Sequence, residues 1–449
     1  MWQMKEGYKP FQEFGRDVYT MASFFPAEVS YNIADPVTAK EIFSSSPRFP
    51  KPLKFYTLLN YFGDNVVGSD GAIWKKHRKP SAPAFRYKNN KLVWDEAAKI
   101  TLSLFDTPEW CGKDVVRIDH ALDVTLPLAL AIISISGFGR EMRWENDAYI
   151  PTGHTMTFKD ALHIVSGNLR VKLLVPEWAL PFRANWRLVE RSFKELQKYM
   201  LEMVTARRTS EVKEERYDLF SGLLDATEKD DARERLTDAE LLGNIFVFLL
   251  AGHETTAHTL AFAFGLLALH PEEQDKLYEE IIGITPDLRI PTYDELGKFK
   301  RTMAVLYETL RFFPPANGIG KTSAEDTTLP TSTGESIVVP QGTLLALDFL
   351  GLHHNTKYWT EPEKFDPSRF LKPDWPREAF FPFSGGVRSC LGRRFFESEA
   401  VAILAVLLSR YRVALPDDLD VKPTWENILV PTMSLTMAPK RIPLAFHKR

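Results

Sequence analysis

One segment, residues 236 to 271, constrains the fold of this chain more than any other. It reads LTDAELLGNIFVFLLAGHETTAHTLAFAFGLLALHP, with Thr237 and Glu240 spaced as a helix-capping box and Pro271 at its end. This pattern predicts a helix of about nine turns and about 50 Å, long enough to cross a whole protein. Apolar residues surround its first half and predict burial, yet the polar stretch from Gly252 to Thr256 interrupts its middle.

The rest of the chain also has mainly helical periodicity. Further helices are predicted over four segments: 192–208, 271–282, 296–312 and 393–411. Strands are predicted at 29–33 and within ESIVVPQGTLLALDF, where residues 340–342 form a turn. Two charged stretches, 211–216 and 228–235, are predicted to be exposed connections. With no internal repeat and no linker-like change in composition, we expect a mainly helical protein with a small sheet.

Charge and cysteine content exclude several classes of protein. The net charge of -3, with no block of like charge, gives no reason to expect a nucleic-acid partner. The two cysteines, Cys111 and Cys390, are too few for a disulfide framework or a multi-cysteine zinc site. The sequence has no uncharged apolar run of about eighteen residues, so it predicts no membrane-spanning segment.

Cys390 lies in an unusual local sequence, FFPFSGGVRSCLGRRFFESEA. Its glycines, Gly385, Gly386 and Gly392, permit a tight turn close to a flat cofactor, and backbone amides pointing at the sulfur would favour its thiolate form. Arg388 adds a positive charge that can pair with an anionic cofactor group. A lone cysteine is more often a small buried hydrophobic residue. A zinc site lacks nearby partners, and a nucleophile would need a base that the sequence does not place.

The segment matches the pattern F-x-x-G-x-R-x-C-x-G and so resembles the haem-binding loop of the cytochrome P450 family. The five matching positions are Phe383, Gly386, Arg388, Cys390 and Gly392. The resemblance implies haem b as the cofactor, Cys390 as the axial ligand of its iron, and the other four residues as parts of the haem-binding site.

A second match lies on the predicted helix that ends in ETLRFFPP. Glu308 and Arg311 are three residues apart and share one helical face, where an exposed ion pair would contribute only about tenths of a kcal/mol. Together with Arg369 in EPEKFDPSRF, they instead resemble the buried Glu-Arg-Arg network that anchors the cysteine loop in the family. Loss of one partner from such a network would cost about 3 to 5 kcal/mol.

The polar interruption AGHETT of the long helix resembles the oxygen-activation motif of the family. Ala251 and Gly252 would leave room beside the iron, and the Thr255 hydroxyl would hydrogen-bond dioxygen from the same helical face as Ala251. Glu254 would relay protons through water. A threonine inside a helix more commonly hydrogen-bonds back to the preceding turn, but the motif favours the catalytic role. The two nearby histidines are interpreted as ordinary helix residues: His253 and His258.

Near the N-terminus, GAIWKKHRKP resembles the W-x-x-x-R element that faces a haem propionate. Trp74 and Arg78 share one helical face, and the planar Arg78 guanidinium can donate two hydrogen bonds to a carboxylate. Lys321 and His353 also occupy family positions toward the haem. Lys321 stands where arginine is usual and cannot make a bidentate contact, while Phe396 stands where a small residue is common. These two departures predict weaker propionate binding and altered packing behind the haem.

The resemblance extends from about Phe14 to the C-terminus. It implies one domain over residues 1–449, with the triangular, mainly α fold of the family and its small β-sheet. The implied activity is monooxygenation of a hydrophobic small molecule, with electrons from NADPH through NADPH-cytochrome P450 reductase or a similar donor. Two alternatives are an enzyme of this fold that isomerises or dehydrates its substrate without dioxygen, and a haem-thiolate sensor without turnover. The presence of Thr255 argues against the first, and that of Glu254 and Thr255 against the second.

Substrate contacts are expected from residues 55–67, 158–174 and 316–319, and from Phe248 and Ala251. The chain resembles eukaryotic, above all fungal, members, but begins near the start of their globular part, so we expect it to lack their N-terminal anchor. With an anchor the protein would lie on the cytoplasmic face of the endoplasmic reticulum; as given, we expect a soluble monomer. The apolar patch from Leu173 to Phe182 would allow peripheral membrane contact, and a buried loop explains it equally well.

Overall fold

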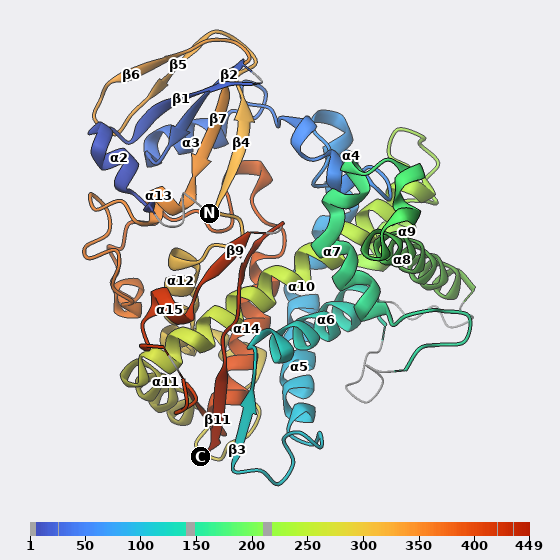
Figure 1. Cartoon of the computed structure of the whole chain (residues 1–449), viewed down its shortest axis with the longest axis vertical. Coiled ribbons are helices and arrows are strands. Elements are labelled where there is room, and N and C mark those ends of the chain that lie inside the picture. The colour runs from blue at the N-terminus through green and yellow to red at the C-terminus, as the bar shows by residue number, and fades with distance from the viewer. Residues whose placement is uncertain (1–5, 26, 141–148, 210–217, 420, 434) are drawn as a thin grey trace.

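Helices dominate the computed structural model, which describes residues 6–25, 27–140, 149–209, 218–419, 421–433 and 435–449 (Figure 1). The helices are α2 (Lys9–Phe14), α3 (Pro36–Ser44), α4 (Gly71–Ser81), α5 (Tyr87–Leu104), α6 (Leu122–Phe138), α7 (Phe158–Leu174), α8 (Ala184–Thr209), α9 (Leu219–Asp225), α10 (Asp238–Leu269), α11 (Pro271–Ile284), α12 (Lys300–Phe312), α13 (Phe349–His353), α14 (Arg393–Leu408) and α15 (Trp425–Ile428). The strands are β1 (Val18–Phe24), β2 (Ala27–Ile33), β3 (Val115–Ile118), β4 (Gly318–Thr322), β5 (Thr327–Pro330), β6 (Ser336–Val339), β7 (Leu344–Asp348), β8 (Tyr411–Ala414), β9 (Pro431–Met433), β10 (Met437–Pro439) and β11 (Leu444–Lys448).

The long central helix is confirmed as α10, which crosses the middle of the molecule (Figure 1). Thr237 caps it by accepting the N–H of Glu240 at 3.2 Å, and the Glu240 carboxylate accepts the N–H of Thr237 at 2.8 Å. The helix ends at Leu269, and Pro271 begins α11. Because α10 packs along α6 while α14 packs along α5, these four helices contribute to the largest cluster of buried apolar side chains.

The main sheet lies beside α2 and α3, with strand order β1-β2-β7-β4 (Figure 1). β2 runs parallel to β7, and β4 runs antiparallel to β7 with Lys321 opposite Leu345. The predicted turn after β6 is confirmed, since the Thr343 N–H donates to the Pro340 carbonyl at 3.2 Å and Gly342 has a φ of 81°. The strands flanking that turn do not pair with each other, because β6 pairs with β5 instead.

Several predicted elements have different bounds in the structure. α8 begins at Ala184 rather than at residue 192, because its buried face continues through Val189. α12 begins at Lys300 because residues 293–298 form a separate 3-10 helix with its own capping box. α14 ends at Leu408, since the chain from Tyr411 pairs with β11 as β8. The stretch 211–216 lies outside the described residues, and 228–235 is largely exposed, as predicted.

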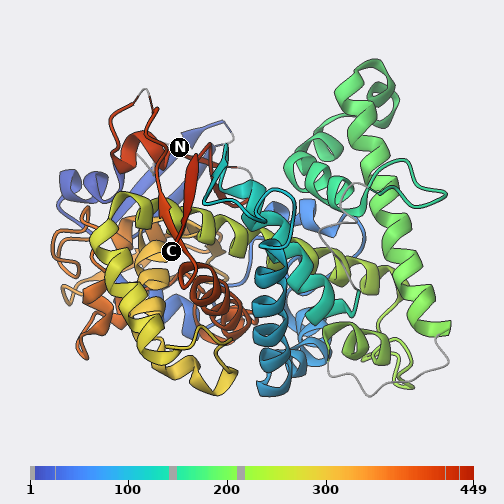
Figure 2. The same ribbon diagram turned by 90° about the horizontal axis from the view of Figure 1, so that it is seen from below.

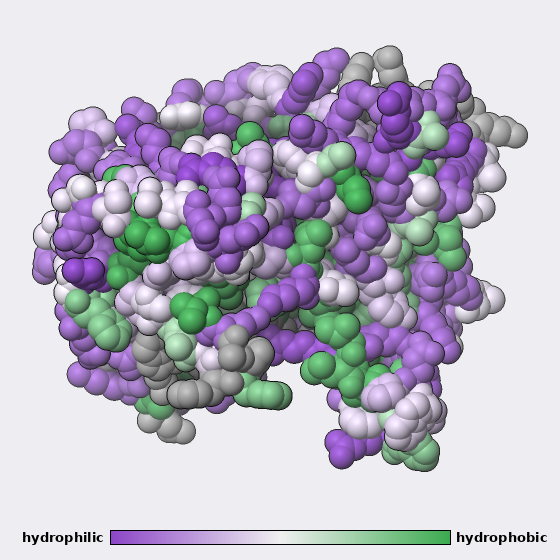
Figure 3. Space-filling view, turned by 90° about the horizontal axis from the view of Figure 1, so that it is seen from above, coloured by the Kyte–Doolittle hydropathy of each residue, from purple (hydrophilic) through white to green (hydrophobic). Residues whose placement is uncertain are grey.

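A lobe made of α7, α8 and the 3-10 helix η5 (Glu177–Phe182) projects from the rest of the molecule (Figure 2). Figure 3 shows hydrophobic side chains on this lobe, beside a hollow in the surface. Leu174, Trp178 and Phe182 are 74%, 74% and 75% exposed, so the patch from Leu173 to Phe182 is not a buried loop. Of the helices in the described parts of the chain, none is both long and apolar enough to cross a bilayer.

Candidate active site

A cavity of about 390 Å³ lies between α10 and the segment that carries Cys390. Its walls come from α4, α6, α10, β4, the segment 382–396 and the loop before α4. Ten of the residues singled out in the sequence line it: Trp74, Arg78, Ala251, Gly252, Thr255, Lys321, Phe383, Arg388, Cys390 and Gly392. Six others do not: Glu254, Glu308, Arg311, His353, Arg369 and Gly386.

The Cys390 side chain opens onto this cavity. The Cys390 N–H donates to the Phe383 carbonyl at 2.9 Å, which closes the loop, and α14 begins three residues later with Gly392 as its N-cap. Burial raises the pKa of the Cys390 thiol, whereas hydrogen bonds from the N–H groups of Gly392 and Arg393 and the positive charge of Arg78 lower it. The start of α14 therefore presents the donors that stabilise a thiolate.

The two glycines before the cysteine serve the packing of its loop. A Cβ atom on Gly386 would lie 2.3 Å from the Phe43 carbonyl oxygen, and one on Gly385 would lie 2.7 Å from the Phe43 ring. Gly386 also has a φ of 65°, a conformation that residues with a side chain rarely adopt. Gly386 therefore lets the loop lie directly on the end of α3, outside the lining of the cavity.

Glu308, Arg311 and Arg369 meet in one buried cluster, where α12 packs against the 3-10 helix η7 (Pro367–Leu371). The Arg311 Nε and Nη2 donate to the two Glu308 oxygens at 2.7 and 2.9 Å, and the Arg369 Nε donates to the Glu308 Oε1 at 3.1 Å. The Glu308 and Arg311 side chains are 0% exposed. The remaining donors of the two guanidinium groups reach backbone carbonyls of residues 353, 360, 361 and 364, so the charges are desolvated but hydrogen-bonded.

His353 does not line the cavity, which departs from the expectation that it contacts a haem. Its ring is fully buried, and its Nε2 accepts the N–H of Phe381 at 3.0 Å. Its carbonyl accepts the Arg311 Nη1 at 2.9 Å. His353 thus links the buried charge cluster to the beginning of the cysteine loop.

The polar stretch of α10 faces the cavity in part. Ala251 and Thr255 line it, but the Thr255 hydroxyl donates to the Ala251 carbonyl at 2.7 Å, so the back-bonded arrangement is the one present. With its proton used in this way, the oxygen of Thr255 can act toward the cavity only as an acceptor. At Gly252, a Cβ atom would lie 2.9 Å from the Ile133 side chain of α6, so its small size permits close helix packing.

Glu254 lies on another face of α10, away from the cavity lining. Burial raises the pKa of its carboxyl group, and the neighbouring hydroxyl groups of Ser166 on α7 and of Thr436 oppose this shift. The Nδ1 of His258 lies 3.0 Å from the Thr436 hydroxyl, and the Nδ1–H of His253 donates to the Leu249 carbonyl at 2.8 Å. Within the described ranges, no group of three His, Cys, Asp or Glu side chains could hold a metal ion.

One end of the cavity is strongly positive. The Arg388 guanidinium lies 4.4 Å from the Trp74 ring centre, forms an ion pair with Asp70 and donates to the Ser69 carbonyl at 3.1 Å. The Arg78 guanidinium lies 5.4 Å from the centre of the same Trp74 ring and donates to the Ser389 carbonyl at 3.3 Å. Burial and the charge of Arg388 lower the pKa of Lys321, which is 4% exposed.

Lys51 is a further cation of this end that the sequence reasoning missed. It lines the cavity, with its ammonium 3.9 Å from the Tyr56 ring centre and hydrogen-bonded to the Val67 carbonyl. Burial and the charges of Arg388 and Lys321 lower its pKa to about 7. No local pattern marks Lys51. Asp70, in contrast, precedes a helix as a side-chain N-cap, a signal that sequence reading could have used.

The residues present fit a haem. Four cations, Lys51, Arg78, Lys321 and Arg388, surround one end of a mainly apolar cavity, where Asp70 is the carboxylate that pairs with Arg388. The Arg388 Nε is buried without a hydrogen-bond partner among the described residues. Two propionate groups would offset most of this charge, and the sulfur opening onto the same cavity can serve as an iron ligand.

Most of the expected substrate walls border the cavity. Residues 55–67 contribute Tyr56, Val66 and Val67, and 316–319 contribute Ala316 and Ile319. Phe248 and Ala251 also line it, as expected. The segment 158–174 contributes no lining residue, because it forms α7, which packs against α8 and the 3-10 helix η2 (Thr57–Asn60).

Comparison with known proteins gives matches over the whole chain. The profile of the family described as "Cytochrome P450" matches residues 4–444. "Cytochrome P450 monooxygenase 124" of Postia placenta is 48% identical, with alignment over 100% of this chain and 88% of that protein. "Cytochrome P450 monooxygenase ORF6" of Penicillium roqueforti is 29% identical, over 100% and 84%. The crystal structure of the cytochrome P450DA heme domain superposes with a TM-score of 0.81 at 25% identity, covering 99% of this chain and 93% of that chain.

The buried charge cluster makes a prediction about stability. Replacing Glu308 by alanine leaves the Arg311 and Arg369 guanidinium groups without their carboxylate, so the free energy of unfolding should fall by about 3 to 5 kcal/mol. Equilibrium urea unfolding measures this change. As a control, Asp95→Ala removes the exposed partner of Lys91, at 2.8 Å on α5, and should change the free energy by less than about 0.5 kcal/mol. Equal losses in the two variants would contradict the role given to Glu308.

Proposed function

This chain belongs to the cytochrome P450 family and is a haem-dependent monooxygenase with a haem-thiolate cofactor, and on that premise we propose which residues carry the reaction. We infer that the cofactor is haem b, that Cys390 is its axial ligand, and that residues 1–449 form one domain that acts as a monomer. The observation that supports this most strongly is the Cys390 side chain, which opens onto a cavity bounded by Ala251 and Thr255 of α10.

When bound, the haem would supply the redox chemistry that activates dioxygen for insertion of one oxygen atom into the substrate, with electrons from the redox partner. Arg78, Arg388 and Lys321 would hold its propionates, with Trp74 packed beneath the two guanidinium groups. Phe383 would pack near the sulfur, its ring 5.8 Å from that of Phe396. Gly386 and Gly392 would shape the loop on which the sulfur lies.

Thr255 and Glu254 are proposed to move the protons of the reaction. The Glu254 carboxyl, whose pKa is raised by burial, would hold a proton between Ser166 and Thr436. That proton would pass through water to the face of α10 on which Thr255 lies. The Thr255 oxygen would accept a hydrogen bond from a protonated group in the cavity, because its own proton is donated to the Ala251 carbonyl.

The coarse features of the substrate and the partner follow from the family: the substrate is hydrophobic, and a redox partner supplies electrons. NADPH-cytochrome P450 reductase or a similar donor would bind over the start of α14. Arg393 and Arg394 are 53% and 60% exposed there and do not line the cavity. The buried ring of Phe395 on α14 lies 6.3 Å from that of Phe85, which comes just before α5, and the first turns of α5 carry exposed basic residues. Such a surface suits an acidic partner.

The lobe is proposed to contact a lipid bilayer at the cytoplasmic face of the endoplasmic reticulum. Its apolar patch exposes Leu173, Leu174, Trp178 and Phe182. Three basic residues around the patch are exposed too: Arg170, Arg183 and Arg187. Apolar side chains that enter the interface, with cations level with anionic headgroups, are typical of peripheral membrane binding.

Replacing Cys390 by serine should abolish the red-shifted Soret band that thiolate ligation implies for the reduced, carbon-monoxide-bound protein. A hydroxyl remains, but it does not ionise to an iron ligand as a thiol does. The absorbance spectrum of the purified protein measures this. Cys111→Ser, which removes the other cysteine, is the matched control and should leave the band unchanged. A red-shifted band in Cys390→Ser would contradict the assignment of Cys390 as the axial ligand.

Thr255→Ala and Glu254→Gln should both lower the yield of product for each NADPH oxidised, by about tenfold or more. Oxygen uptake, NADPH oxidation and product are measured with the reductase and a hydrophobic substrate found by screening. As a control, Thr101→Ala on α5 removes a hydroxyl that is also bonded to the preceding turn, 2.7 Å from the Ala97 carbonyl. This residue does not line the cavity, so the variant should keep the parent yield.

The pH dependence of the rate gives a separate test of Glu254. Because the raised pKa keeps Glu254 protonated to higher pH, the parent rate should decline as pH rises through that pKa. Glu254→Gln should lack this decline, and its persistence would exclude Glu254 as the donor.

The double variant Trp178→Ala/Phe182→Ala should bind more weakly to vesicles of 70% phosphatidylcholine and 30% phosphatidylserine. Loss of two apolar side chains from the interface should reduce partitioning by about tenfold or more. Cosedimentation measures the bound fraction. Val338→Ala/Leu371→Ala, which removes two exposed apolar side chains outside the lobe, should bind as the parent does. Equal binding of both double variants would argue against the lobe as the contact.

A further inference from the structure

The loop between η2 and α4, residues 61–70, forms a wall of the cavity. Val66 and Val67 line it, while Ser69 and Asp70 contact Arg388. One end of this loop is thus attached to the cysteine loop. At its other end the loop meets α10, and the contacts there can position Val66 and Val67 over the cavity.

The loop lies directly on the backbone of α10. A Cβ atom on Gly63 would lie 1.9 Å from the Ala239 carbonyl oxygen, and one on Gly243 would lie 2.3 Å from the Gly63 carbonyl oxygen. Gly63 also has a φ of 141°. This approach leaves no room for side chains between the two segments, so a polar group of α10 can reach the loop backbone directly.

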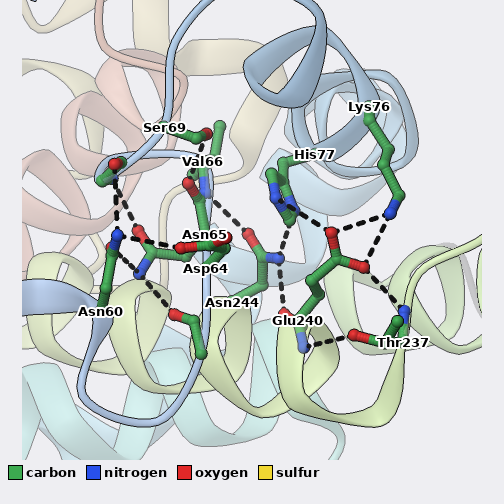
Figure 4. A network of polar contacts seen from close by, with 12 residues as sticks. Asn60, Asp64, Asn65, Val66, Ser69, Lys76, His77, Thr237, Glu240 and Asn244 are labelled. Atoms are coloured by element: carbon green, nitrogen blue, oxygen red, sulfur yellow. Dashed lines mark hydrogen bonds and ion pairs between the residues drawn. The ribbon is translucent and has the colours of Figure 1, made fainter. Parts of the chain in front are cut away.

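Asn244, in the second turn of α10, makes that contact (Figure 4). Its Oδ1 accepts the N–H of Val66 at 3.0 Å, and its Nδ2 donates to the Glu240 carbonyl at 2.7 Å and to the His77 Nδ1 at 2.8 Å. The Asn244 side chain is fully buried, so each of these bonds lacks competition from solvent. Burial lowers the pKa of His77, which keeps its Nδ1 available as an acceptor.

A second amide makes the loop itself stiff. The Asn65 Oδ1 accepts the N–H groups of Val67 and Gly68 at 3.0 and 2.9 Å, and its Nδ2 donates to the Leu59 carbonyl at 2.8 Å. A movement of Val66 relative to α10 would therefore carry Val67 with it. The bond from Val66 to Asn244 ties this internally braced loop to α10.

We propose that Asn244 is a positioning residue that sets the Val66–Val67 wall against α10 and so determines which bulky molecules the cavity accepts. This inference rests on the proposed assignment of the cavity as the place where substrate binds above Cys390. Asn244 acts on the substrate through the loop backbone, since it does not itself line the cavity.

The test compares two nitrogen ligands of the haem by their spectral titrations: imidazole, and 4-phenylimidazole, which is larger by a phenyl ring. Asn244→Leu keeps the size of the side chain but removes its polar atoms. The Kd for 4-phenylimidazole should rise by about tenfold, while that for imidazole should change by less than about twofold. The control Gln274→Leu removes an equally buried amide that accepts the Val413 N–H at 2.7 Å, far from the cavity, and should change neither Kd. Equal changes for both ligands, or none, would overturn the proposal.

Two further measurements keep the proposal testable if Asn244→Leu takes up no haem. Asn244→Asp retains an acceptor for the Val66 N–H, so it should bind 4-phenylimidazole more tightly than Asn244→Ala does. Amide hydrogen exchange, followed by mass spectrometry on the protein with or without haem, should accelerate in residues 61–70 of Asn244→Leu and not in Gln274→Leu. Unchanged exchange in this loop would refute the positioning role. Failure of imidazole to bind the parent protein would instead refute the proposed haem site.

Discussion

The buried ion cluster of Glu308, Arg311 and Arg369 is the interaction on which the site depends. A single buried carboxylate serves two guanidinium groups, and their other donors reach the backbone of the segment 353–364. The Asp366 N–H also donates to Glu308 at 2.9 Å. Because desolvated charges are tolerated only when every partner is in place, this cluster favours a single arrangement of α12, α13 and the chain that follows. The hydrogen bond from the Phe381 N–H to His353 attaches the beginning of the cysteine loop to these elements.

The cysteine loop is also attached to elements distant in sequence. The glycines at 385 and 386 lie on Phe43 at the end of α3, and Arg388 is bound to residues 69 and 70 before α4. The sulfur is therefore located by contacts on several sides, although its own segment has little regular structure. The loop before α4 carries both the cavity wall at Val66 and the residues that bind Arg388. The wall and the position of the sulfur are therefore coupled.

Patterns that act locally allowed much of the architecture to be predicted. The capping box and the proline define α10 because both work within a few residues of the helix ends. By contrast, α6 was not predicted: it contains Pro127 and is buried on almost every side, so it shows no amphipathic period. β1 was also missed, since it exists through its pairing with β2, which no local pattern reveals.

Within the site, the spacing of Glu308 and Arg311 indicated a shared face, and the motif around Arg369 indicated their partner. The close packing at Gly252 and the position of His353 could not be predicted, because they depend on Ile133 and Phe381, which approach from elsewhere in the chain. Lys51 was missed for the same reason.

The positive end of the cavity has a consequence for the uptake of an anionic cofactor. Burial, together with the charges of Arg388 and Lys321, lowers the pKa of Lys51 to about 7, so this lysine is only partly protonated at neutral pH. Carboxylates placed among these cations would raise that pKa, so the lysine would gain a fraction of a proton as they bind. Cofactor capture and proton uptake are then thermodynamically linked, and the affinity of the folded protein for a dicarboxylate increases as the solution becomes more acidic through neutrality. The protein thus adjusts its own charge to that of the molecule it receives.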